Sequence, residues 1–186
     1  MNWMFTTLLL LTQIFLVAQS PSQTRTLEGK IDSLLCPIGY MATGHPYLPF
    51  RLTNDKKTVD NQSIKGKVVF INFWFEGCHP CMAEMDALNK LFEKMKDKKD
   101  FVFITVTWDN DETIKRVTQK FSLIFDIFAA SPAECQRLNF GCGYPTSVVL
   151  DKKGIVKYRH SGGTNDNEKA DHFILTTLLT EIECLL

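Results

Sequence analysis

Residues 67–75, KVVFINFWF, place the strongest constraint on what this chain can fold into. The segment is almost entirely apolar, β-branched and aromatic, and both of the faces that alternate along a strand are apolar. A strand of this kind is buried on both sides, as in the centre of an α/β sheet. Asn72 is the one polar residue inside the run.

The chain beyond this strand alternates between helices and strands. A helix is predicted from His79 to Lys96, because apolar residues recur there at steps of three and four. Further along we expect strands at 101–107, 146–150 and 155–159, a helix capped by Asp109 or Asp111 and ending at Phe121, a short helix opened by Ser131 and ending before Gly141, and a closing amphipathic helix from Asn165. Residues 46–66 predict a β-hairpin ahead of the sheet. This order indicates one α/β domain with a mixed sheet.

The composition narrows the classes of function. The 186 residues include 21 Lys and Arg against 21 Asp and Glu, so no basic excess points to nucleic acid. The length suits one domain, and 45% hydrophobic residues with 14 Phe can form a core without disulfide cross-links. These values argue against disordered, collagen-like, coiled-coil and polytopic membrane chains.

The first 20 residues contain no charged side chain, and residues 3–18 are apolar apart from a few Thr and Gln. This run fits an export signal better than a membrane span, which needs about 20 residues. Cleavage after Ser20 is compatible with the small residues there, whereas the missing basic start leaves an uncleaved membrane anchor open. We expect an exported, periplasmic or extracytoplasmic protein, with an irregular lead-in at 21–45 and a folded domain at 46–186.

Cys78, His79, Pro80 and Cys81 lie where the buried strand is predicted to end and the helix to begin. The first turn of a helix has unpaired N–H groups and a partial positive charge, which stabilise a thiolate. The pKa of Cys78 should therefore fall below the free value of roughly 8.5, and a protonated His79 would lower it further. We predict that Cys78 is the exposed nucleophile and that Cys81, one turn on, is the buried resolving thiol.

Two simpler explanations of this pair are a static disulfide and half of a zinc site. A four-thiolate zinc site would need a second CxxC, and the other four cysteines are not so spaced. A CxxC at a strand-to-helix junction of an α/β chain favours redox chemistry instead. We predict no metal and no cofactor.

The segment NFWFEGCHPCMAEM at 72–85 resembles the active-site segment of TlpA/ResA-like thiol-disulfide oxidoreductases of the thioredoxin superfamily. The resemblance extends from about Pro46 to the C-terminus, and it includes GYPT at 143–146, which is similar to the family's cis-proline segment. It implies a thioredoxin fold, with a central mixed β-sheet flanked by helices and an N-terminal β-hairpin extension. Gly77 departs from the aromatic residue that the family often has there.

Glu84 is three residues after Cys81 and shares the inward face of the predicted helix with Leu88 and Leu91. A carboxylate on an apolar stripe is unusual. Partial burial would raise its pKa toward neutrality and suit it to move protons to and from Cys81, a role that the resemblance also implies. The alternative is a glutamate at the edge of the stripe, favoured by the helix N-terminus.

The remaining site residues are predicted to bind substrate or to support the site. The resemblance implies a cis peptide bond before Pro145, which would bring the Tyr144 backbone beside Cys78 to pair with an extended substrate strand. An ordinary proline opening an edge strand is the alternative. Trp74 is expected near the site as a substrate-binding residue, although core packing explains it equally well. Asn72 could hydrogen-bond the active-site backbone or be a satisfied core amide.

The other four cysteines have no predicted role. Cys135 and Cys142 are too far apart for a disulfide if helix persists between them, but a helix break at Gly141 leaves a bridge open. Cys36 and Cys184 could pair if the ends of the mature chain meet. Three pairings are possible, and a buried or free thiol is the favoured interpretation for each cysteine.

These observations predict an exported thiol-disulfide oxidoreductase. Cys78 would attack a disulfide of a partner protein, Cys81 would resolve the mixed disulfide, and Glu84 would handle its proton. Pro80 and the resemblance favour a reductase that is re-reduced by a membrane thiol electron donor. Membrane contact of the chain itself is expected only if the N-terminal segment is retained.

Two alternatives stay open. A copper metallochaperone would use the two thiols of the CxxC with Met82 or Met85 as soft ligands, although the usual CxxxC and distal His are missing. A thiol peroxidase of the same superfamily would normally have Thr three residues before the reactive cysteine, where this chain has Phe75.

Overall fold

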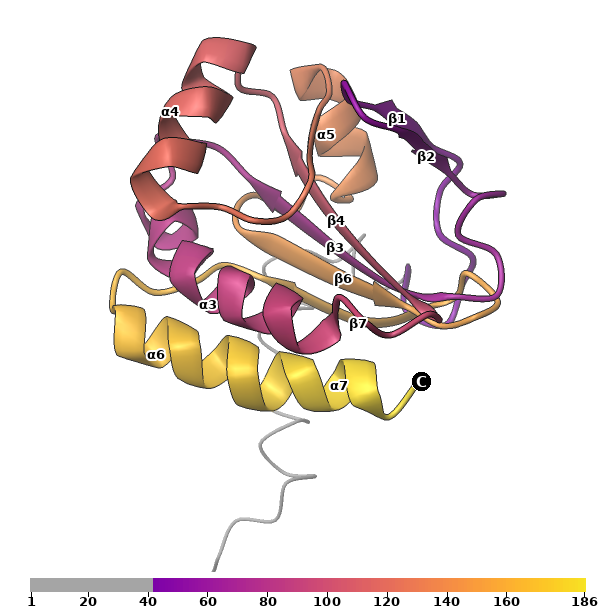
Figure 1. Ribbon diagram of the computed structural model, residues 1–186. Coiled ribbons are helices and arrows are strands. Elements are labelled where there is room, and N and C mark those ends of the chain that lie inside the picture. The colour runs from indigo at the N-terminus through magenta and orange to yellow at the C-terminus, as the bar shows by residue number, and fades with distance from the viewer. Residues whose placement is uncertain (1–41) are drawn as a thin grey trace, which may run out of the picture.

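The computed structural model describes residues 42–186, which form a five-stranded sheet covered by helices on both faces (Figure 1). The strands are β3 (Val68–Trp74), β4 (Phe101–Thr107), β5 (Ile127–Ala129), β6 (Thr146–Leu150) and β7 (Val156–Ser161). Their order is β5-β4-β3-β6-β7, in which β3, β4 and β5 are parallel and β6 is antiparallel to β3 and β7. The predicted mixed sheet is confirmed. The predicted export signal and most of the lead-in lie outside the described residues.

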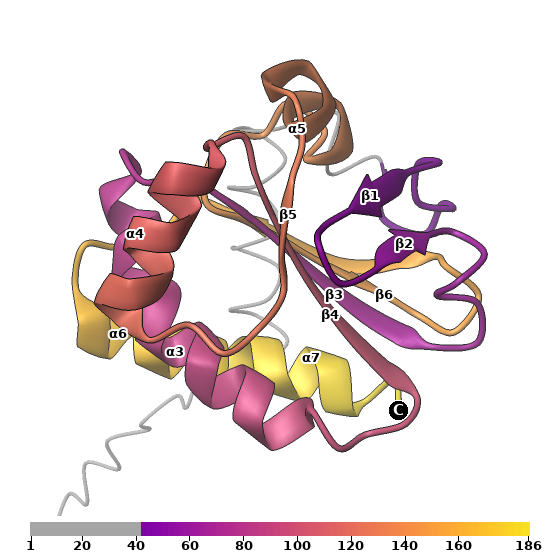
Figure 2. The same ribbon diagram turned by 45° about the horizontal axis from the view of Figure 1, so that its top comes forward.

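The helices are α3 (His79–Met95), α4 (Asp111–Phe121), α5 (Pro132–Leu138), α6 (Asn167–His172) and α7 (Leu179–Glu183), with a π-helical segment at Phe173–Leu178 between the last two. α3 and the α6–α7 stretch cover one face of the sheet (Figures 1 and 2). On the other side lie α5 and the predicted hairpin, formed by β1 (Arg51–Thr53) and β2 (Thr58–Asp60). Within residues 42–186, no helix is both long and apolar enough to cross a membrane.

All seven residues of β3 are buried, as the apolar run predicts. Alternate side chains enter two separate cores: Val68, Phe70 and Trp74 pack with the buried face of α3, and Val69, Ile71 and Phe73 pack with α5 and the hairpin. A strand held on both faces and between two neighbouring strands has little freedom to move. Its C-terminal end therefore gives the following residues a rigid base.

Three local features differ from the sequence predictions. β5 was not predicted, because a three-residue strand is too short to show a periodicity. Asn110, and neither Asp109 nor Asp111, caps α4: its side chain accepts from the Thr113 N–H at 2.9 Å. The closing helix is interrupted by its π-helical segment, so its apolar positions depart from one regular 3.6-residue repeat.

Candidate active site

The CxxC pair lies at the N-terminus of α3, as predicted. Cys78 is the N-cap residue, with extended backbone dihedrals of φ −88° and ψ 97°, and its Sγ accepts from the Cys81 N–H at 3.2 Å. Pro80 stands in the first turn, where a missing N–H leaves no helical hydrogen bond unmade. The Cys78 sulfur therefore sits among the unpaired N–H groups of the helix end, an environment that favours a thiolate over a thiol.

Cys78 and Cys81 form a disulfide, with their Cα atoms 5.2 Å apart. Cys81 is 1% exposed, as predicted for the resolving thiol. Cys78 is only 6% exposed, so the prediction of an exposed nucleophile is wrong for this oxidised state. The reason is that its sulfur is bonded to that of Cys81, which belongs to the inward face of α3. Of the two, Cys78 is still the more accessible to an attacking thiolate.

Glu84 lies one turn after Cys81 on the buried face of α3 and is 3% exposed. Burial raises the pKa of its carboxyl from 4.5 to about 8, since the charged form loses its hydration. The alternative position at the edge of the stripe is therefore wrong. A pKa of about 8 favours the protonated carboxyl at neutral pH, and the carboxyl lies within one helical turn of Cys81.

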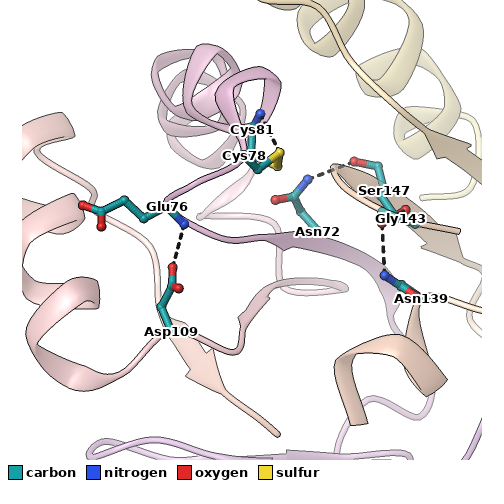
Figure 3. The surroundings of a disulfide bond; sticks show 9 residues. Asn72, Glu76, Cys78, Cys81, Asp109, Asn139, Gly143 and Ser147 are labelled. Carbon is teal, nitrogen blue, oxygen red and sulfur yellow. Dashed lines mark hydrogen bonds between the residues drawn. A yellow bond between two sulfur atoms is a disulfide. The ribbon is translucent and has the colours of Figure 1, made fainter. Parts of the chain in front are cut away.

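Asn72 occupies the middle of β3, on the face that packs against α3. Figure 3 shows its side chain beneath the disulfide, with the amide Nδ2 donating to Ser147 Oγ of β6 at 3.2 Å. Of the two alternatives for Asn72, the bond to the active-site backbone is absent, and the amide instead bonds to a neighbouring strand because Ser147 is its register partner. Its Oδ1 is buried without a hydrogen-bond partner among the described residues.

The Tyr144–Pro145 peptide bond is cis, as the resemblance implies. The segment before it is held by Asn139, which is buried at the end of α5 and was not recognised from the sequence. Asn139 donates to the Gly143 carbonyl at 3.0 Å (Figure 3). It also accepts from the Gly141 N–H at 2.9 Å. Thr146 also donates to the Gly143 carbonyl, at 2.8 Å. Side-chain bonds thus fix the loop that carries the cis proline.

Aromatic side chains surround the start of the CxxC turn. Tyr144 is half-buried and meets the ring of Phe75 edge-on, with the ring centroids 5.3 Å apart. Trp108, which was not predicted as a site residue, stacks on Phe75 at 4.5 Å and meets Tyr144 at 4.5 Å. Its position just after β4, where a parallel strand ends beside β3, is the signal that could have found it. Trp74 is fully buried in the core cluster that also contains Cys78, so the prediction that it binds substrate is wrong and core packing accounts for it.

The turn between β3 and α3 is also tied to the end of β4. Asp109 accepts from the Glu76 N–H at 2.7 Å (Figure 3), and its own N–H donates to Thr107 Oγ1 at 3.1 Å. The Glu76 carboxylate takes two hydrogen bonds from Arg116 of α4, which lowers the pKa of Glu76. Asp109 is therefore a positioning residue of the turn instead of a helix cap.

The other cysteines differ from one another. Cys135 is free and buried, and burial is the main reason that the pKa of its thiol is raised to about 11. Cys184 is free and exposed. Cys142 is disulfide-bonded, so the free-thiol interpretation is wrong for it, and its partner is not among the described residues. A Cys135–Cys142 bridge and a pairing that uses Cys184 are both absent from this structure.

Neither alternative chemistry gains support from the described residues. No group of three or more His, Cys, Asp and Glu within 42–186 could hold a metal ion. Met85, one of the soft ligands considered for copper, is fully buried in the core below the disulfide. Phe75 presents a ring to Trp108 and Tyr144 and has no hydroxyl with which to bind a peroxide.

A CxxC disulfide at a helix N-terminus, a cis proline and a sheet of this order together define a thioredoxin-fold thiol-disulfide oxidoreductase. The sequence model of the Redoxin family matches residues 42–174, and the chain belongs to this family.

Individual relatives agree with this assignment. The chain is 30% identical over 119 residues to the thioredoxin-like protein YneN of Bacillus subtilis, which covers 63% of this chain and 68% of YneN. It is 31% identical over 100 residues to the thiol-disulfide oxidoreductase ResA of Bacillus thuringiensis, covering 54% of this chain and 58% of ResA. A thiol:disulfide interchange protein of the thioredoxin family from Chlorobium tepidum superposes with a TM-score of 0.56 at 25% identity, covering 72% of this chain and 95% of that one.

Proposed function

We propose that this chain is an exported reductase of protein disulfides, in which Cys78 attacks, Cys81 resolves and Glu84 transfers the proton of Cys81. The observation that carries the proposal is the placement of a disulfide at the N-cap of α3, one helical turn above a buried carboxyl. The similarity to ResA, which is named a thiol-disulfide oxidoreductase, supports the reaction class.

In the reduced protein, the Cys78 thiolate attacks one sulfur of a substrate disulfide. A mixed disulfide forms, and the other substrate sulfur leaves as a thiolate. Cys81 then gives up its proton and attacks the Cys78 sulfur, which releases the second substrate thiol and forms the Cys78–Cys81 disulfide. The two electrons thus pass from the enzyme dithiol to the substrate, and the enzyme ends in the oxidised state of this structure.

Glu84 serves both halves of this cycle. During resolution its ionised form accepts the proton of Cys81, and its raised pKa gives it enough proton affinity to do so. When a donor thiolate attacks the oxidised enzyme at Cys78, Cys81 is the leaving sulfur. A protonated Glu84 then returns the proton, so that a buried thiolate does not remain unneutralised.

Substrate binding is proposed to use the cis-proline loop. The Tyr144 backbone would pair with an extended segment of the substrate, and the half-buried rings of Phe75, Trp108 and Tyr144 would contact its side chains. His79, exposed in the first turn of α3, would border the same opening. The partners are therefore protein disulfides, with a membrane thiol protein as the proposed electron donor and residues 1–20 as the export signal or anchor.

Insulin reduction driven by dithiothreitol tests the activity. Wild type should act faster than Cys78→Ser, Cys81→Ser and the double variant, and a wild type no faster than the double variant would remove the proposal. The reduction potential of the Cys78/Cys81 pair, measured against glutathione, tests the direction. A potential near that of thioredoxin, about −270 mV, supports a reductase, whereas one near about −120 mV marks an oxidant.

Export is tested separately by fusing residues 1–20 to a reporter enzyme that is active only outside the cytoplasm. A reporter that stays inactive would refute export and leave the thiol chemistry untouched. Mass spectrometry of the full chain expressed with its N-terminus decides between a cleaved signal and a retained anchor.

A further inference from the structure

Gly163 is exposed on one side and closely packed on the other. A Cβ atom built on it would lie 2.9 Å from Pro145 Cγ, 3.0 Å from Glu84 Oε1 and 3.2 Å from Pro80 Cβ. These three groups belong to the cis-proline loop, the proposed proton-transfer residue and the CxxC turn. Two of them are proline rings, which cannot swing aside as a flexible side chain can. A side chain at position 163 would therefore require the backbone itself to move.

The segment that contains Gly163 is tied to the cis-proline loop by hydrogen bonds. The Gly162 N–H donates to the Pro145 carbonyl at 2.9 Å, and Ser161 Oγ shares a hydrogen bond of 2.8 Å with Thr146 Oγ1. Gly162 has φ +89°, a backbone conformation that residues with a side chain rarely adopt. Two adjacent glycines thus let residues 161–164 follow the cis-proline loop closely and reach the first turn of α3.

This segment also forms a wall over Glu84. A cavity of about 380 Å³ is lined by Glu84 together with His160, Ser161, Gly162, Gly163, Thr164, Ala170 and Phe173. His160 of β7 is the ionisable neighbour in this lining. On α6, Lys169 pairs with Asp166, and Asp171 pairs with Lys90 of α3. Burial, and no charged neighbour, is the cause of the raised pKa of Glu84. Glu84 is nevertheless only 3% exposed, so residues 161–164 separate its carboxyl from most of the water that this cavity can hold.

We propose that Gly163 is a positioning residue whose missing side chain lets residues 161–164 close against Pro80, Glu84 and Pro145, keeping the Glu84 carboxyl shielded from water. The shielding of Glu84 is a property of the oxidised protein and does not depend on the proposed function. Only its effect on the redox cycle rests on that function. Any residue with a Cβ would push the segment outward and let water reach the carboxyl.

The test is Gly163→Ala, with Gly77→Ala as the matched control. Gly77 is also exposed beside the CxxC turn and lacks a positive φ, but a Cβ there would meet only the Phe75 ring, at 3.1 Å. The pKa of Glu84 is read in the oxidised proteins from its carboxyl infrared band, assigned by its loss in Glu84→Gln. We expect Gly163→Ala to weaken the proton affinity of Glu84 by about tenfold or more, and Gly77→Ala to leave it unchanged.

A second variant guards against misfolding of the first. Gly162→Ala displaces the same segment through backbone strain, because a Cβ at Gly162 has open space around it but an unfavourable φ. It should lower the pKa of Glu84 in the same direction. Thermal unfolding shows whether Gly163→Ala and Gly162→Ala are folded. If both are folded and the infrared band of Glu84 titrates with the wild-type pKa in each, the inference is overturned.

The proposed function fails on a different result. If Glu84→Gln reduces insulin as fast as wild type across pH, Glu84 has no catalytic role, yet the infrared outcome for Gly163→Ala is unaffected. If both proposals hold, Gly163→Ala should shift the pH profile of insulin reduction to lower pH by the same amount as the infrared titration. Gly77→Ala should change the rate, if at all, without moving the profile.

Discussion

Replacing Glu84 by Gln should make the oxidised protein less sensitive to alkaline pH, because it removes a carboxyl that is expensive to ionise. Burial raises the pKa of Glu84 from 4.5 to about 8 in the folded protein. The folded state therefore binds this proton more tightly than the unfolded chain does. The stabilisation is complete below pH 4.5, declines as the pH rises and is lost above pH 8.

The magnitude follows from the difference of about 3.5 between the two pKa values. At 1.36 kcal/mol for each pH unit, the full linkage is about 5 kcal/mol, of which about 4 kcal/mol falls between pH 5 and pH 9. That is a large part of the 5–15 kcal/mol by which a domain is typically stable. Gln has nearly the same shape and cannot ionise, so its burial energy is constant over this range.

Urea unfolding of oxidised wild type and Glu84→Gln at pH 5, 7 and 9 measures the effect. The stability of the variant relative to wild type should rise by about 4 kcal/mol from pH 5 to pH 9. Glu93→Gln is the control, because Glu93 lies on the same helix but is exposed and paired with Lys96. A relative stability that changes by less than about 1 kcal/mol, as expected for the control, would refute the reasoning about burial.

Three further outcomes check the supporting contacts. Asp109→Ala should slow insulin reduction several-fold at unchanged redox potential, because the Glu76 N–H loses its acceptor and the turn before Cys78 becomes less rigid. An unaltered rate would show that Asp109 is not a positioning residue. Asn139→Ala should lower the unfolding free energy by about 2 kcal/mol and raise the KM for a peptide disulfide, because two side-chain hydrogen bonds that hold the loop are lost, although the Gly143 carbonyl keeps its bond from Thr146 and the Gly141 N–H keeps its bond to the Gln136 carbonyl. A change in stability alone would limit Asn139 to folding. Iodoacetamide at pH 8 should label Cys184 in the native protein and Cys135 only after unfolding, because burial raises the pKa of the Cys135 thiol to about 11. Peptide mass spectrometry identifies the labelled cysteine, and rapid labelling of Cys135 in the native protein would contradict its burial.

The parts of the site that follow from local pattern were predictable. The apolar run of β3 requires a central strand, and the steps of three and four after Cys78 require a helix, so the CxxC had to stand at their junction. Glu84 was recognisable because a carboxylate interrupts an apolar stripe. The cis bond before Pro145 followed from the resemblance and could not have been obtained from periodicity.

The parts that depend on contacts between distant segments were not predictable. Asp109 was predicted as a helix cap because it lies just before α4 in the sequence. Its side chain instead accepts a hydrogen bond from the Glu76 N–H, 33 residues away. Asn139 and Trp108 acquire their roles only when α5 and β4 are placed beside the CxxC turn. No sequence pattern marks Gly163 as important, because its role depends on which atoms of other segments a side chain at this position would contact.

The stability linkage and the site geometry support each other. An apolar residue at position 84 would pack in the core without any penalty at alkaline pH, so folding alone does not account for a carboxyl there. The structure then adds a glycine at 163 that leaves room for this carboxyl and covers it, although a larger residue would lose less backbone entropy on folding. Glu84 and Gly163 are each unfavourable for stability, and both lie at the same carboxylate oxygen, Glu84 Oε1, one helical turn from Cys81. The proposed proton transfer to Cys81 would give both residues a common reason, and loss of that transfer in Glu84→Gln is the result on which this reasoning depends.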